Sequence, residues 1–114
     1  MRHWILEGKE TRKVVLEEWA QWFETAQERQ LADTTQGDVR ISTVFLGIDH
    51  SFGTGGPPIL FETLIFGGRY EGEMQRAATY DEALIHHANA VRNVKRSQGW
   101  LRWWFALKDL WDER

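Results

Sequence analysis

The segment Ile41–Gly68, with the sequence ISTVFLGIDHSFGTGGPPILFETLIFGG, decides the fold. It holds most of two runs rich in β-branched and aromatic residues, near 39–48 and 59–66, and such runs predict strands. The connection between them is glycine-rich and ends in Pro57-Pro58, which cannot donate hydrogen bonds to a sheet. We therefore expect an antiparallel pair joined by an ordered surface loop. Because the runs are apolar almost throughout, we expect the first strand to be covered on both faces.

Two helices are predicted on either side of this pair. Apolar residues from Leu16 to Ala26 recur at helical spacing with glutamates and glutamine between them, which predicts a helix near 16–29. Thr79–Glu82 fits the capping box, in which the threonine oxygen accepts one of the free N–H groups of a helix start. A helix near 80–96 is therefore expected to follow.

Shorter elements complete the predicted order. His3–Leu6 is a strand candidate, and Thr11–Val15 is either its hairpin partner or the lead into the following helix. Glu73–Ala78 is a candidate edge strand. Leu31–Asp38 (LADTTQGD) contains few apolar residues and is predicted to be a polar connection.

The C-terminal segment Trp100–Trp111 has an amphipathic pattern, and Gly99 is expected to separate it from the preceding helix. A tryptophan stripe at helical spacing is usually part of a core or a self-association surface. The alternative is a helix that docks on another protein, because tryptophan is a common anchor in interfaces. The candidate interaction residues are Trp100, Trp103, Trp104, Leu107 and Trp111.

Length and composition indicate one small folded α+β domain. A chain of 114 residues with 42% hydrophobic and 27% charged residues can close one core but not two. We expect a core domain over 1–96, in which a short antiparallel sheet is covered by the helices near 16–29 and 80–96. Residues 97–114 are expected to form a helix that packs on this domain or mediates assembly.

Composition also excludes several classes of function. The chain has no cysteine, so neither disulfides nor thiolate zinc sites can form. Its N-terminus lacks the apolar core of a signal peptide and no run is long enough to cross a membrane, which favours a cytoplasmic protein. The net charge is −3, and the first 91 residues carry eight basic and fourteen acidic side chains. Nucleic-acid binding is therefore not expected.

Four polar residues are candidates for a ligand site. Asp49 and His50 close the first strand, Glu62 lies in the second, and His87 lies on the apolar face of the helix near 80–96. If that helix packs on the sheet, the four side chains could converge. Imidazole and carboxylate groups can hold zinc or manganese or move protons, so His50, Glu62 and His87 are candidate metal ligands.

A purely structural role explains the same residues. Asp49 before a glycine-rich loop is a normal turn residue that bonds its own backbone. A carboxylate in an apolar strand needs a partner, and Arg40, Arg76 or His87 could pair with Glu62. The spacing matches no known metal signature, and no catalytic motif is present. No cofactor is therefore expected, and the sequence favours a protein without catalytic activity.

Three runs of residues carry a resemblance to a known group of proteins. Gly37–His50 (GDVRISTVFLGIDH), Pro57–Thr63 (PPILFET) and Phe66–Gly68 (FGG) resemble a family of small uncharacterised proteins encoded by tailed bacteriophages and prophages. Trp19–Glu24 and the helix from Thr79 to His87 also match this family. The likeness covers roughly residues 3–95. The tail beyond Arg96 and the second histidine at position 86 depart from it.

The resemblance implies a setting but no reaction. A phage protein of this size would act inside an infected bacterium, and small phage proteins are often inhibitors or adaptors of host machinery, including defence systems. We therefore expect a non-catalytic protein that binds a host or phage protein, or itself, through the tryptophan tail and the Asp49–Pro58 loop. One alternative is a metal- or ligand-binding protein, or a small hydrolase, that uses Asp49, His50, Glu62 and His87. Another is a minor component of the virion.

Overall fold

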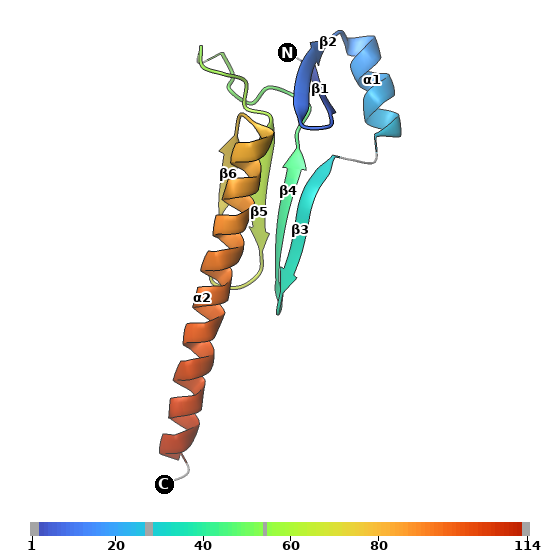
Figure 1. Cartoon of the computed structure of the whole chain (residues 1–114). Coiled ribbons are helices and arrows are strands. Elements are labelled where there is room, and N and C mark those ends of the chain that lie inside the picture. Colours follow the sequence, from blue (N-terminus) through green and yellow to red (C-terminus); the bar gives the residue numbers. More distant parts are fainter. Residues whose placement is uncertain (1–2, 27–28, 54, 113–114) are drawn as a thin grey trace.

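The computed structural model describes residues 3–26, 29–53 and 55–112, with side chains described as far as Gly99. The described chain forms a β-hairpin, a four-stranded antiparallel sheet and two helices, so the predicted α+β class is confirmed (Figure 1). In chain order the elements are β1 (His3–Glu7), β2 (Glu10–Val14), α1 (Leu16–Thr25), β3 (Gln30–Gln36), β4 (Val39–Phe45), β5 (Phe61–Phe66), β6 (Met74–Ala77) and α2 (Tyr80–Asp112).

The four-stranded sheet has the simple order β3-β4-β5-β6, in which each strand pairs with its neighbours in the sequence. In the central pair Thr43 lies opposite Thr63 and Phe45 lies opposite Phe61. Because side chains alternate along a strand, these four residues point to the same face of the sheet. That face is the one that α2 covers (Figure 1).

Helix α2 packs on the sheet through two apolar clusters. Near its start, Ala83 lies with Phe45 and Phe61, and one edge of the Tyr80 ring meets the Phe61 ring. About three turns after Ala83, Val94 belongs to the cluster of Val39, Ile41 and Ile65. The helix begins as the capping box predicts, because Thr79 Oγ1 accepts the Glu82 N–H at 3.1 Å.

Helix α1 does not cover the sheet, in contrast to the prediction from the sequence. It ends at Thr25 and packs beside β1 and the end of β4, where Trp19 Nε1 donates to the Gly47 carbonyl at 2.9 Å. Of the two alternatives for Thr11–Val15, the hairpin partner is the one observed, since β1 and β2 pair in full register. The hairpin is tied to the main sheet through the Trp4 N–H, which donates to the same Gly47 carbonyl.

Strand β3 corrects the prediction of a polar connection over Leu31–Asp38. It pairs with β4 from Gln36 back to Gln30, with one irregularity between Gln30 and Ala32. The strand is not predicted from the sequence because its two faces differ little in polarity, so the alternation of apolar and polar residues typical of a strand is missing. The side that faces α2 carries Thr34, whose hydroxyl is bonded in the interior.

Helix α2 is a single helix of 33 residues, so Gly99 does not separate two helices as predicted. Glycine inside a helix costs only about 1 kcal/mol relative to alanine, which is too little to end a helix by itself. At 1.5 Å per residue α2 is about 50 Å long, whereas a seven-residue strand spans about 23 Å. In the described part of the chain, no helix has the length and apolar content needed to cross a membrane.

The loop between β5 and β6 folds back against the turn between β3 and β4, and glycine is required where they meet. Gly67 has a φ of +88°, and a Cβ there would lie 2.8 Å from the Asp38 carbonyl oxygen. At Gly68 a Cβ would lie 2.6 Å from Val39 Cγ2. The two glycines therefore allow backbone and side chains to approach closely at this end of the sheet.

We expect Gly67→Ala to destabilise the protein more than Gly72→Ala does. Both glycines have positive φ, but a Cβ at Gly72 meets nothing within 4 Å. The backbone term alone should cost about 1–2 kcal/mol at either position, and the collision with Asp38 should add about 1–3 kcal/mol at Gly67. Urea unfolding of the two variants measures the difference. Equal losses would show that the close approach is not enforced.

Candidate functional site

Asp49 and His50 have structural partners in the loop that follows β4. Asp49 Oδ1 accepts the N–H of Ser51 at 2.8 Å and that of Ile59 at 3.0 Å. His50 Nδ1 lies 2.8 Å from the Ile48 carbonyl oxygen, and its backbone N–H donates to Ile59. The carboxylate thus ties together the two ends of the loop, as the structural interpretation of Asp49 predicts.

Glu62 points to the opposite face of the sheet from α2. It lies next to Thr63 in β5, and neighbouring residues in a strand face opposite sides. Its carboxylate pairs with Arg76 of β6 at 3.3 Å. The predicted need for a partner is therefore met by one of the two arginines named from the sequence.

The four candidate ligand residues are not brought together. His87 lies under α2, Glu62 lies on the other face, and Asp49 and His50 lie in the loop beyond the strand ends. Within the described residues, no three His, Asp or Glu side chains are grouped so that they could hold a metal ion. The sequence-based cluster of these residues is thus not formed as a single site.

His87 instead joins α2 to the sheet through a buried network of hydroxyl groups. Its Nε2 lies 2.8 Å from Thr34 Oγ1 of β3, and its Nδ1 lies 2.8 Å from Thr43 Oγ1 of β4. Thr43 Oγ1 in turn lies 2.7 Å from Thr63 Oγ1 of β5. One helix and three strands therefore meet in one hydrogen-bonded chain, and His87 is only 7% exposed.

The neutral imidazole suits this network. A neutral ring has one N–H donor and one acceptor nitrogen, and each hydroxyl can both donate and accept. Burial disfavours the charged ring and lowers the pKa of His87, while the nearby Asp33 carboxylate acts in the opposite direction. Asp33 is itself held ionised by Arg40, whose hydrogen bonds lower the pKa of that carboxyl. The network therefore links α2 to the sheet.

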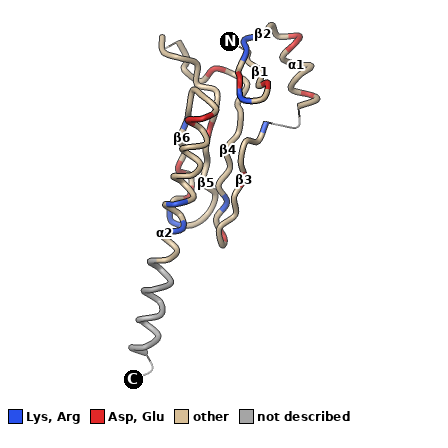
Figure 2. Tube along the Cα trace, viewed as in Figure 1, with Lys and Arg blue, Asp and Glu red and all other residues tan. Residues whose placement is uncertain are grey.

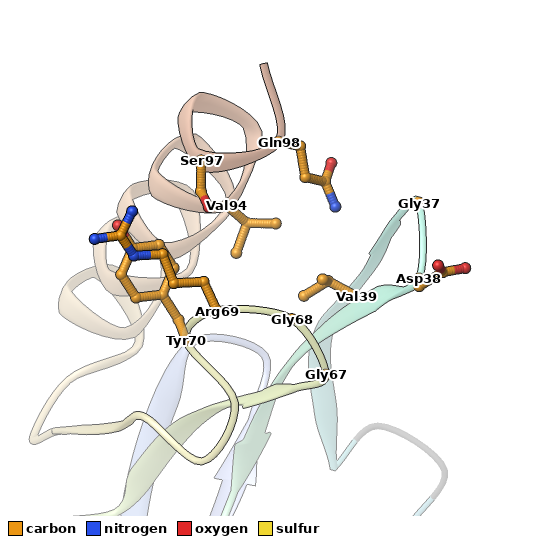
Figure 3. Close-up of a pocket in the computed structure, with 10 residues that line it drawn as sticks. All are labelled: Gly37, Asp38, Val39, Gly67, Gly68, Arg69, Tyr70, Val94, Ser97 and Gln98. Atoms are coloured by element: carbon orange, nitrogen blue, oxygen red, sulfur yellow. The ribbon is translucent and has the colours of Figure 1, made fainter. Parts of the chain in front are cut away.

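A cavity of about 310 Å³ lies at the far end of the sheet from the loop of Asp49 (Figure 3). Its walls are the β3–β4 turn (37–39), the start of the β5–β6 loop (67–70) and one face of α2 at Val94, Ser97 and Gln98. Gln98 Nε2 donates to the Gln36 carbonyl at 2.6 Å and holds the helix to the turn. No site is predicted here from the sequence, in which Gly67-Gly68 is the one local signal.

The face of the sheet opposite α2, called the outer face below, carries an apolar strip. Leu64 of β5 lies opposite Met74 of β6, and Val44 and Phe66 belong to the same side. Phe66 is 44% and Met74 50% exposed. Among the described elements, contacts with strands β3–β6 from a helix come mainly from α2, so the expected cover on both faces of β4 is absent over this strip.

Charged pairs flank the apolar strip of the outer face. Arg40 binds the Asp33 carboxylate with two hydrogen bonds, of 2.9 and 3.2 Å, and its guanidinium lies 5.8 Å from the centre of the Phe66 ring. Glu62 and Arg76 form the second pair. The outer face is thus apolar at its centre and has fixed charges beside it.

The predicted interaction residues of the tail lie outside the side chains that the structure describes. These are Trp100, Trp103, Trp104, Leu107 and Trp111, all within the helical backbone of α2. Their role stays a prediction from the sequence.

Comparisons with protein-family models, curated proteins and solved structures find no match to this chain. The site has to be interpreted from its own geometry.

We expect Thr43→Val to destabilise the protein by about 1–3 kcal/mol, because it leaves one nitrogen of His87 and the Thr63 hydroxyl without their partner. Valine matches the shape of threonine, so little packing is lost. The matched control is Thr35→Val, an exposed position on β3, which should change the free energy of unfolding by less than about 0.5 kcal/mol. Chemical denaturation measures both, and similar values would contradict the role of the network.

The pH dependence of stability should report on His87. The unfolded chain binds this proton near pH 6.5, whereas the folded protein binds it only at lower pH. Stability should therefore fall as the pH drops below about 6.5, with a slope of at most about 1.4 kcal/mol per pH unit, and the fall should end below the folded-state pKa.

His87→Gln should remove this part of the pH dependence while lowering stability at neutral pH. Denaturation between pH 8 and pH 5 is the appropriate measurement, because the contribution of Asp33, whose folded pKa is lowered, is lost only as the pH falls through the carboxylate range. A variant with the same slope as the parent would contradict the assignment to His87.

Proposed function

We propose that this chain is a small non-catalytic protein that binds a partner protein on the outer face of its sheet. The observation that carries the proposal is the apolar strip of Val44, Leu64, Phe66 and Met74, in which Phe66 and Met74 are exposed and Val44 and Leu64 are half-buried. A solvated face of an antiparallel sheet is usually polar, with apolar residues kept for the covered face. A contiguous apolar strip on the open face is instead typical of a contact surface.

The composition and shape of the outer face favour a protein as the ligand. Phenylalanine, methionine and arginine are enriched in protein interfaces, and the rim of an interface is polar. The Arg40 guanidinium lies over the Phe66 ring and is held by Asp33, so part of the surface is ordered before binding. A sheet face is broad and shallow, whereas small molecules are bound in concave pockets.

The resemblance to phage proteins supplies the proposed setting. The partner would be a host or phage protein in the bacterial cytoplasm, and binding would inhibit or redirect it. The loop after β4 is a second contact candidate, because Phe52 at its tip is 75% exposed with its ring edge against His50. The tryptophan segment of α2 remains the third, on the strength of its sequence pattern.

The test is affinity capture from a lysate of infected bacteria with four purified proteins. These are the parent chain, the double variant Phe66→Ser/Met74→Ser, the control Ile85→Ser and a chain that ends at Gly99. Ile85 is 60% exposed on α2 and lies away from the outer face, so it matches the loss of apolar surface. Circular dichroism establishes that each variant is folded.

We expect one specific partner that is captured by the parent and by Ile85→Ser but bound at least about 30-fold more weakly by the double variant, as for a loss of about 2 kcal/mol at an interface centre. Equal capture by the double variant would reject the outer face. If only the shortened chain loses the partner, the contact belongs to the tryptophan segment instead.

A further inference from the structure

The cavity between α2, the β3–β4 turn and the β5–β6 loop lies on the helix side of the sheet and is separate from the outer face. Its volume of about 310 Å³ is at the lower end of the range for small-molecule sites. Segments far apart in the sequence form its walls, so its shape exists only in the folded protein. Figure 3 shows Val39 and Val94 projecting between these walls, with Gln98 reaching down from α2 toward the turn.

The floor of the cavity is apolar. Val39 and Val94 are buried and belong to the cluster in which Tyr70 packs. Gly67 and Gly68 form the lower wall with backbone alone, and their lack of a Cβ lets Val39 pack directly against Gly68. An apolar body of one or two rings would replace water on this floor.

One wall carries a positive charge that has no acidic partner within the described residues. The other arginines at the sheet, Arg40 and Arg76, are paired with carboxylates. Arg69 instead lies over the Tyr70 ring, with its guanidinium carbon 5.8 Å from the ring centre. Asp38 also lines the cavity, but Figure 3 shows its carboxylate on the outer side of the turn, directed away from Arg69.

The surroundings add to this positive charge. Arg92, Lys95 and Arg96 are exposed on the part of α2 that also carries Val94 and Ser97, and Figure 2 shows blue on this part of the helix. The β5–β6 loop carries Glu71 and Glu73 besides Arg69. Ser97 contributes a hydroxyl group at the wall of the cavity. A guanidinium can hold a carboxylate with two parallel hydrogen bonds, and a hydroxyl can donate a third.

We propose that this cavity binds a small organic anion, a carboxylate on an apolar body of one or two rings. The body lies on Val39, Val94 and Tyr70, and the carboxylate is bound by Arg69 with Ser97 beside it. This inference goes beyond the proposed protein contact and does not depend on it, because the two surfaces lie on opposite sides of the sheet.

The experiment is calorimetric titration of the full chain with three probes of nearly equal size: 2-naphthoate, 2-naphthylmethanol and 2-naphthylmethylamine. We expect saturable 1:1 binding of the acid, at least tenfold weaker binding of the neutral alcohol and none of the cationic amine. A tenfold change corresponds to about 1.4 kcal/mol, the lower end for a charge-assisted hydrogen bond. Amide spectra locate the probe, and the N–H signals of Gly67 and Gly68 should shift with naphthoate.

Three variants test the assignment. Arg69→Gln keeps most of the side chain and should weaken naphthoate about tenfold while leaving the alcohol unchanged. Ser97→Phe fills the cavity and should abolish binding of both, and Arg92→Gln, which removes a nearby charge outside the lining, should change neither by more than about twofold. Thermal melting shows whether each variant is folded. Because Arg69 is exposed, Arg69→Gln should stay folded, so it still tests the proposal if Ser97→Phe unfolds.

Absence of binding by all three probes would overturn the proposal. Equal affinity for acid and alcohol would remove the role of Arg69, and glycine signals that do not move would place the probe elsewhere on the protein. Each of these outcomes leaves the result of the partner-capture experiment unaffected.

Discussion

The contact between His87 and the threonine hydroxyls is the interaction on which the arrangement depends. It fixes α2 at one height above β3, β4 and β5, because each ring nitrogen has one hydroxyl partner and the ring is shut off from water. Apolar packing alone would tolerate a helix shifted along the sheet. A buried polar group does not, since a shift would leave it without a hydrogen bond. The helix end that forms the cavity is placed by this constraint, together with the Gln98–Gln36 bond.

The two faces of the four-stranded sheet differ in the residues that they present and in whether a helix covers them. The side under α2 is closed by apolar clusters and leaves a basic-walled hollow where the glycine loop meets the helix. The other side is flat, with apolar residues between fixed ion pairs. A helix on that side would have made a three-layer protein in which both faces of the sheet are enclosed. Its absence among the described elements gives a small chain two surfaces with different chemistry.

The sequence predicted the elements whose periodicity is clear and missed those whose partners are distant. The central strands, the first hairpin and the capped start of α2 follow from local pattern. Strand β3 does not, because Thr34 becomes an interior residue only when His87 reaches it across 53 positions of sequence. For the candidate site, Asp49 as a turn residue and Arg76 as the partner of Glu62 were foreseeable. The expected grouping of Asp49, His50, Glu62 and His87 is not formed, because alternation along β5 places Glu62 on the face opposite Thr63 and α2.

The polar composition of β3 also affects the tendency of the protein to aggregate at high concentration. In the order β3-β4-β5-β6, β3 is an outer strand with one row of backbone groups facing away from its neighbour. Such a strand invites pairing with another chain, and long apolar edges are the usual starting points of aggregation. Here the edge is built from Asp33, Thr34, Thr35 and Gln36, with the Asp33 charge on the outer face. A chain with this edge gains resistance to amyloid-like stacking from the same residues that carry no strand signal.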